Sequence, residues 1–106
     1  METTAVVFRW EREGGVFALF PELPADNQGR YCTCYQHIGQ HAAADYHGCV
    51  ARSRPATPSE YADLCEELEL RGYHLEIYQR ATPVMHERRQ WMATLANRRP
   101  RVDTAR

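Results

Sequence analysis

The chain has 106 residues, of which 43% are apolar, and its net charge at neutral pH is −1. This length provides for one hydrophobic core and excludes two independent domains. No run approaches the roughly 20 consecutive apolar residues of a membrane-spanning helix, and Met1–Thr4 lacks the pattern of a signal peptide, so we expect a cytoplasmic protein with no membrane partner.

Charge is divided unevenly along the chain. Residues 1–79 contain six arginines and twelve acidic residues, a net charge of −6, whereas residues 80–106 contain seven arginines and two acidic residues, a net charge of +5. An acidic body with a basic end attracts partners of either sign, so the charge distribution by itself identifies no partner.

Two strands joined by a tight turn are predicted near the start of the chain. The residues of Ala5–Trp10 alternate between two faces, which is typical of a strand. The turn that follows ends in Gly14 and Gly15 and favours a hairpin. The next strand, Val16–Phe20, is apolar at every position, so we expect both of its faces to be covered. Pro21 and Pro24 are expected to end it.

A third strand and a long loop are predicted next. Tyr31–Gln36 resumes an extended pattern, with Cys32 and Cys34 on one face. His37–Gly48 has no periodicity, because small residues alternate with His, Gln, Asp and Tyr, and we expect an irregular loop there. A short fourth strand, Cys49–Ser53, is expected after it.

The first helix is predicted from a capping motif. The Thr57 hydroxyl can accept from the Glu60 amide while the Glu60 carboxylate accepts from the Thr57 amide, and Pro58 takes the first helical position. Gly72 is placed to end the helix in a left-handed conformation. Four residues at helical spacing form the expected buried stripe: Tyr61, Leu64, Cys65 and Leu68.

A further strand and a second helix complete the predicted domain. Tyr73–Tyr78 alternates as a half-buried strand does, and Thr82 with Pro83 begins the second helix. The apolar residues of that helix are Val84, Met85, Trp91, Met92 and Leu95. We expect a single domain over residues 1–96 and a flexible basic tail over 97–106. The order β-β-β-β-α-β-α predicts an α+β fold with a mainly antiparallel sheet of four to five strands and two helices packed on one face.

Cysteines and histidines concentrate around the predicted loop. In a reducing compartment the four cysteines are expected as free thiols or metal ligands and not as disulfides. Thiolates and imidazoles suit zinc, so one hypothesis is a zinc site formed by Cys32, Cys34, His37 and His41. Their spacing matches no standard zinc framework, and buried cysteines that act as small apolar residues are the alternative.

Two other kinds of chemistry remain open. A cysteine nucleophile could use one of His37, His41 or His47 as its base and Asp45 to orient that base, although no signature of a cysteine hydrolase accompanies them. A nucleic-acid binder would contact phosphates through arginines near the end of the chain. These are Arg88, Arg89, Arg98, Arg99 and Arg101.

Several segments of the chain resemble an uncharacterised family of small bacterial proteins found on mobile elements and prophages. The resemblance covers residues 5–80 and implies no activity, cofactor or catalytic residue. It implies a genomic setting in which a small protein is often an accessory factor that binds a host or competitor protein, as anti-CRISPR inhibitors do. The segments are Val7-Phe8-Arg9, Phe17-Ala18-Leu19-Phe20-Pro21-Glu22, Tyr35-Gln36-His37-Ile38-Gly39-Gln40-His41, Ala44-Asp45-Tyr46 and Thr57-Pro58-Ser59-Glu60-Tyr61-Ala62-Asp63-Leu64.

The leading hypothesis from the sequence is a non-enzymatic protein that occupies a surface on a larger partner. A loop as long as His37–Gly48 inside a small domain is usually functional or disordered. No catalytic residue is assigned, and a zinc- or cysteine-dependent enzyme and an arginine-mediated nucleic-acid binder stay as alternatives. The expected contact residues are His37, Gln40, His41, Asp45 and Tyr46.

Overall fold

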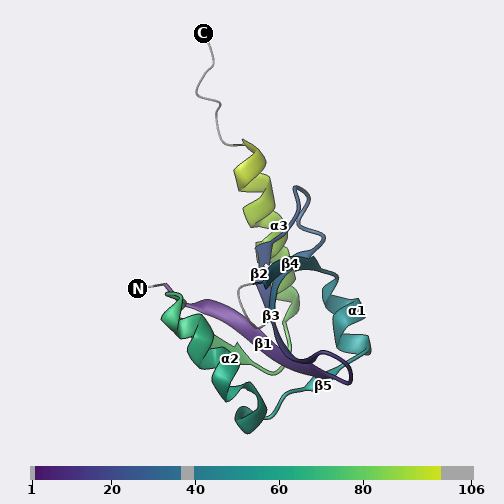
Figure 1. Cartoon of the computed structure of the whole chain (residues 1–106). Helices are drawn as coiled ribbons and strands as arrows, with labels where there is room; N and C mark the ends of the chain where they lie inside the picture. Colours follow the sequence, from purple (N-terminus) through teal and green to yellow (C-terminus); the bar gives the residue numbers. More distant parts are fainter. Residues whose placement is uncertain (1, 37–39, 99–106) are drawn as a thin grey trace.

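A computed structural model describes residues 2–36 and 40–98 of the chain (Figure 1). Within these ranges the elements are, in order, β1 (Thr4–Glu11), β2 (Gly15–Pro24), β3 (Cys32–Gln36), β4 (Gln40–Ala44), α1 (Tyr46–Ala51), β5 (Arg54–Pro55), α2 (Pro58–Leu70), β6 (Leu75–Tyr78) and α3 (Pro83–Arg98). None of the described helices is long and apolar enough to span a membrane.

The described strands form one six-stranded sheet in the order β4-β3-β2-β1-β5, and β6 pairs with β1 on the same edge as β5. All of these pairs are antiparallel except β1 with β6, which is parallel. The predicted α+β class with a mainly antiparallel sheet is confirmed. The sheet has one strand more than the upper prediction, and the described chain contains three helices where two were predicted.

The first two strands form the predicted hairpin, but β2 is longer than expected. Gly15 ends the turn with a φ of +76°, a conformation that favours glycine. The strand was predicted to end at Phe20, stopped by Pro21 and Pro24, but β2 runs through Pro21 and ends at Pro24. The pairing of β2 with β3 shifts register between Phe20 and Pro24, so the ladder does not need the amide hydrogen that Pro21 lacks.

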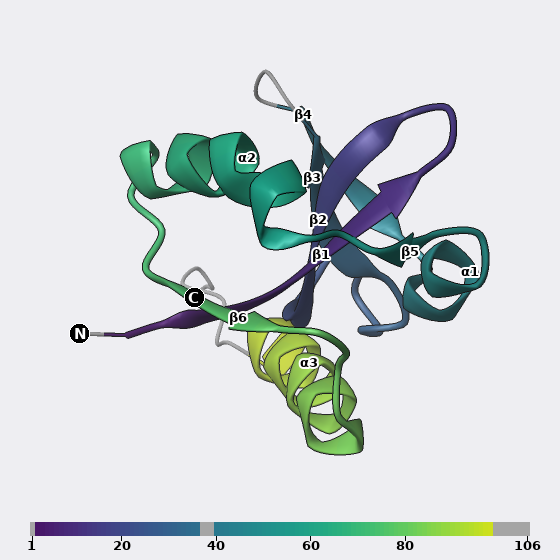
Figure 2. The same ribbon diagram turned by 90° about the horizontal axis from the view of Figure 1, so that it is seen from below.

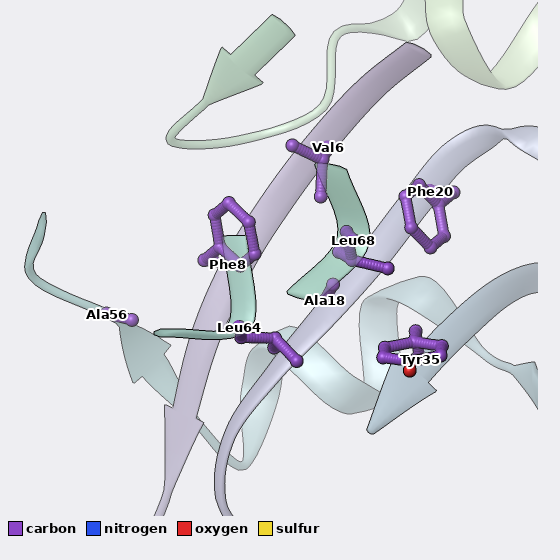
Figure 3. Close-up of a cluster of buried hydrophobic side chains, with 8 residues drawn as sticks. All are labelled: Val6, Phe8, Ala18, Phe20, Tyr35, Ala56, Leu64 and Leu68. Carbon is purple, nitrogen blue, oxygen red and sulfur yellow. The ribbon is translucent and has the colours of Figure 1, made fainter. Parts of the chain in front are cut away.

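Each face of the sheet carries its own apolar cluster. On one face, side chains from β1, β2 and β3 pack against α2, and Figure 3 shows this cluster: Val6, Phe8, Ala18, Phe20, Tyr35, Ala56, Leu64 and Leu68. On the other face the alternate strand residues pack against α1: Val7, Phe17, Leu19, Cys32, Ala44, Tyr46 and Cys49. The expectation that both faces of β2 are covered is therefore confirmed.

The helices are divided between the two faces, so the predicted packing of all helices on one face is wrong. Figure 2 shows α2 on one side of the sheet and α3 on the other. Helix α3 shares its side with α1, because the rings of His86 and Tyr46 lie 4.9 Å apart, centroid to centroid. A sheet whose strands are buried on both faces needs this two-sided cover.

The segment predicted as a long loop is mostly regular structure. Its described part forms β4, which pairs with β3, and the start of α1. Residues 37–39 lie outside the described ranges. The predicted strand Cys49–Ser53 is also wrong, because Cys49 lies within α1 and only Arg54 and Pro55 form β5. Helix α1 is short and is held by the burial of Tyr46 and Cys49.

Helix α2 begins as predicted. Thr57 accepts a hydrogen bond from the Glu60 amide, and the Glu60 side chain accepts one from the Thr57 amide, which completes the capping box. Leu64 and Leu68 are its buried residues, and Gly72 follows the helix with a φ of +106°. The two ends and the buried side of this helix agree with the sequence pattern.

Helix α3 also begins where predicted, after Thr82, whose side chain accepts a hydrogen bond from the Met85 amide. The helix includes Asn97 and Arg98, two residues that the sequence analysis assigned to the tail. The remainder of the predicted tail, residues 99–106, lies outside the described residues.

Candidate functional site

The residues predicted to form one contact surface are divided between the faces of the sheet. His41 is exposed on the α2 side, where its Nε2 lies 3.1 Å from the Tyr73 hydroxyl and its ring packs edge-on against Tyr35. Tyr46 lies on the α1 side and is only 6% exposed. Its hydroxyl accepts a hydrogen bond of 2.7 Å from the Ala81 amide. Tyr46 is therefore a core residue and not the surface contact that was expected.

In the described chain, the other predicted contact residues do not form a common surface with His41. Asp45 is exposed at the start of α1, where its side chain makes no capping hydrogen bond. The backbone of Gln40 pairs with that of Gln36. The Gln40 side chain and all of His37 lie outside the described part, so their binding roles stay predictions.

The residues predicted as zinc ligands are not brought together either. Cys32 and Cys34 belong to the cluster on the α1 side, whereas His41 packs on the α2 side. One ion cannot be reached through a sheet from both faces, so Cys32, Cys34 and His41 do not share a site. Among the described residues, no group of three or more His, Cys, Asp or Glu side chains is arranged to hold a metal ion.

Three cysteines, Cys32, Cys34 and Cys49, gather on the α1 side. Desolvation raises the pKa of the Cys32 thiol to about 12 and also raises the pKa of Cys34 and Cys49. Arg52 donates a hydrogen bond to Cys49 Sγ at 3.4 Å and opposes this shift without outweighing burial. Since the thiolate is the nucleophile, these protonated thiols are poorly suited to covalent catalysis at neutral pH.

The buried side of α3 carries an arginine between two apolar residues. Met85, Arg89 and Ala93 are its buried residues, each four positions after the last. Arg89 is 5% exposed, so the predicted contact between Arg89 and phosphates of a nucleic acid is wrong. Its guanidinium donates to the carbonyl oxygens of Gly29 and Pro21, both at 2.8 Å.

The loop between β2 and β3 follows the same side of α3. Gly29 has a φ of +72°, and a Cβ at this position would lie 2.7 Å from the Cα of Gln90. Farther along the helix, the Asn97 side chain donates to the carbonyl oxygen of Asn27 at 2.6 Å. Backbone contact and polar hydrogen bonds thus attach α3 to the rest of the molecule.

Four large apolar residues of α3 lie on its exposed side. Val84, Trp91, Met92 and Leu95 are 60%, 54%, 44% and 43% exposed, and we call these four residues the α3 stripe. Spacings of seven and four residues between Val84, Trp91 and Leu95 place them on one side of the helix. Arg88 lies among them, exposed, with an ion pair of 3.5 Å to Glu22. No helix or strand of the described chain covers the α3 stripe, and Arg88 adds a basic group to this apolar surface.

From the sequence these four residues were assigned to the second helix together with Met85, with no prediction of which side of the helix they occupy. An informative signal was the series Met85, Arg89, Ala93 and Asn97 at four-residue spacing. After Met85 this series consists of a small residue and two hydrogen-bonding residues, which allows the helix to lie close to a neighbouring backbone, as α3 does beside Gly29. The larger apolar side chains then remain for the opposite side.

Comparison with protein families, with curated proteins and with solved structures found no match to this chain. The resemblance to small proteins of mobile elements and prophages therefore stays a prediction. The function has to be inferred from the surfaces and cavities of the molecule itself.

Proposed function

We propose that this protein is a non-enzymatic binding protein that docks on a larger protein through the α3 stripe. The observation that carries the proposal is the outward position of Val84, Trp91, Met92 and Leu95 while an arginine occupies the buried side. Exposed aromatic and long apolar side chains grouped on one helix face are typical of recognition by a hydrophobic groove. The binding class agrees with the hypothesis from the sequence, although the surface is a different one.

The partner we expect has an apolar groove bordered by carboxylates. Val84, Trp91 and Leu95 would enter the groove, since a helix presents anchors spaced in this way to one side. Arg88 lies among the anchors, Arg98 ends the helix, and the region from residue 80 onward carries a net charge of +5. Carboxylates around the groove would attract this end of the chain and disfavour its acidic body.

The side chains of the α3 stripe favour a protein over a nucleic acid. Trp91 could stack on a base, but Val84, Met92 and Leu95 are not groups that bind bases or phosphates. Of the five arginines predicted to contact phosphates, Arg89 is buried and Arg88 pairs with Glu22. A nucleic acid is therefore an outcome that the experiment has to distinguish and not a second proposal.

The test compares two double variants of α3. Trp91→Ala/Leu95→Ala removes two anchors, and Gln90→Ala/Thr94→Ala changes the exposed positions immediately before them. A protein captured by the wild type would be identified, purified and titrated with each form by calorimetry. We expect wild type and control to bind equally and the anchor variant to bind at least about tenfold more weakly, as loss of a central aromatic anchor does.

Three results would contradict the proposal. Equal binding by all three forms would show that the α3 stripe is not the contact surface. Binding to nucleic acid that falls steeply with salt would indicate phosphate recognition. A wild-type dimer in sedimentation that becomes a monomer in the anchor variant would show that the α3 stripe joins two copies of this chain.

A further inference from the structure

A cavity of about 380 Å³ lies between α1, β5 and the start of α3, away from Trp91 and Leu95. Its size is in the range of small-molecule sites. Its lining combines basic, aromatic and apolar side chains: Arg9, Tyr46, His47, Val50, Pro55, Gln79, Arg80, Ala81, Pro83 and His86. No acidic side chain is among these residues, although acidic and basic residues are almost equal in number in the whole chain.

Arg9 is a buried cation without an acidic partner. It lies on β1 and is 6% exposed, and its guanidinium donates to three neutral oxygens: Nε to Ser53 Oγ at 2.9 Å, and Nη2 to the carbonyl oxygens of Ser53 and Val50 at 2.7 and 3.0 Å. Arg9 makes no ion pair with a described residue. Burial lowers the pKa of its guanidinium, which is the expected effect of a charge that has lost water.

One nitrogen of this guanidinium is left for a ligand. Nη1 has no hydrogen-bond partner among the described residues. Every fully buried side-chain nitrogen of those residues does have a partner, so Nη1 is not fully buried. Nη1 therefore has access to solvent, and Arg9 lines the cavity. A buried guanidinium with an unused donor that faces a cavity favours an anion as ligand, because a counter-charge offsets the cost of burying the charge.

His86 supplies a second hydrogen-bond donor, and its contact with Arg89 determines which ring nitrogen donates. Its Nδ1 lies 2.7 Å from Arg89 Nη1, and because a guanidinium only donates, Nδ1 must accept. The ring proton is then on Nε2, which has no hydrogen-bond acceptor among the described residues and can donate to a ligand. Burial, then the charges of Arg89 and His47, lowers the pKa of His86, which keeps this ring neutral at pH 7.

The rest of the lining defines a charged entrance and an apolar wall. Arg80, Gln79 and His47 are exposed, so a second guanidinium lies at the mouth of the cavity. Val50 and Tyr46 provide apolar surface further inside. The two arginines give the lining two positive charges, and His86 is neutral.

We propose that this cavity binds a small phosphate monoester, with the phosphate between Arg9 and Arg80 and a compact apolar body against Tyr46 and Val50. A phosphate monoester carries close to two negative charges at neutral pH, which matches two arginines, whereas a carboxylate carries one. Arginine also presents paired donors that fit phosphate oxygens. The site lies apart from Trp91 and Leu95, so it does not depend on the proposed docking function.

The experiment titrates the full chain with phenyl phosphate, with benzoate and with phenol by calorimetry. We expect saturable binding of one phenyl phosphate per chain, weaker binding of benzoate and none of phenol. Arg80→Gln should weaken phenyl phosphate binding about tenfold, the effect of losing one charge-assisted hydrogen bond. Arg30→Gln, an exposed arginine of the β2–β3 loop, is the matched control and should bind as the wild type does.

Arg9→Met tests the buried cation directly, and its fold is checked by circular dichroism because the hydrogen bonds to Ser53 and Val50 are lost. If it folds, phenyl phosphate binding should be abolished, and if it does not, Arg80→Gln still decides the result. Absence of saturable phenyl phosphate binding in the millimolar range would overturn the proposal. So would equal loss in Arg80→Gln and Arg30→Gln, or benzoate binding as tight as phenyl phosphate binding.

Discussion

Helices α2 and α3 begin with the same Thr-Pro pair, yet they are attached to the sheet in opposite ways. Helix α2 turns Leu64 and Leu68 inward and leaves its acidic side in solvent. Helix α3 turns Arg89 inward and leaves Trp91 and Leu95 exposed. A capping motif therefore fixes where a helix starts, whereas the neighbouring backbone determines which side of the helix is buried.

The two helices also stabilise the fold by different interactions. Leu64 and Leu68 of α2 belong to an apolar cluster with strand residues, and the hydrophobic effect is the main contribution there. Helix α3 buries Met85 and Ala93, but it is also held by hydrogen bonds from Arg89 to Gly29 and Pro21 and by close backbone contact with the β2–β3 loop. Substitution of Leu64 or Leu68 in α2 should therefore affect stability, whereas substitution of the exposed Trp91 or Leu95 in α3 should affect binding.

The largest expected effect is that of Leu68→Ala. Leu68 is fully buried at the centre of the α2 cluster (Figure 3), so the substitution leaves a cavity and should lower the free energy of unfolding by about 4 kcal/mol. Leu95→Ala, on the exposed side of α3, should change it by less than about 0.5 kcal/mol. Urea unfolding followed by circular dichroism measures both values. A similar loss in the two variants would mean that Leu95 is also a core residue.

A smaller effect is expected where α3 meets the β2–β3 loop. Gly29→Ala would place a Cβ 2.7 Å from the Cα of Gln90 at a φ of +72°, so overpacking is added to backbone strain, and we expect a loss of about 3 kcal/mol. Gly15→Ala is the matched control. It has a φ of +76° and open space around it, so strain alone should cost about 1 kcal/mol.

The difference between the two glycine variants, again from urea unfolding, measures how closely α3 approaches the loop. Equal losses would show that the loop moves away from Gln90 at little cost. The attachment of α3 would then depend more on the hydrogen bonds of Arg89 than on close backbone contact with the loop.

Much of the fold could be predicted because local signals and packing agree. The hairpin ending in Gly15, the capping box of Thr57 and Glu60, and the Leu64–Leu68 stripe each specify a local structure that the sheet also requires. The strand β4 could not be predicted from its own residues. Ala42, Ala43 and Ala44 have low strand propensity, and only pairing with β3 makes them a strand.

The candidate site was predicted much less well than the fold. The sequence drew attention to clustered cysteines and histidines, but the alternation of side chains across the sheet separates Cys34 from His41. The cavity combines Arg9 with Arg80 and His86, two residues that lie far from Arg9 in the sequence. Without the topology, in which α1 and α3 share a face, nothing in the sequence indicates that these residues meet.

The smallest effect concerns the cap that makes α2 the predictable helix of the pair. Hydrogen bonding to Arg54, then to the Thr57 amide, lowers the pKa of Glu60 to about 2 from an ordinary value of 4.5. A carboxyl whose pKa is lowered by folding stabilises the folded state above its unfolded pKa, and this stabilisation is lost as the pH falls toward the folded pKa. The contribution of Glu60 should thus be complete above pH 4.5 and disappear as the pH falls to about 2.

Glu60→Gln tests this pH dependence because glutamine keeps an acceptor for the Thr57 amide but carries no charge. We expect the variant to be less stable than wild type at pH 7, and the melting temperatures of the two proteins to converge between pH 4.5 and about 2. Glu66→Gln, on the exposed side of α2 and without an ion pair in the described chain, should leave the wild-type profile unchanged. A constant difference between wild type and Glu60→Gln across this range would mean that the Glu60 charge contributes nothing and that its hydrogen-bonding geometry alone caps the helix.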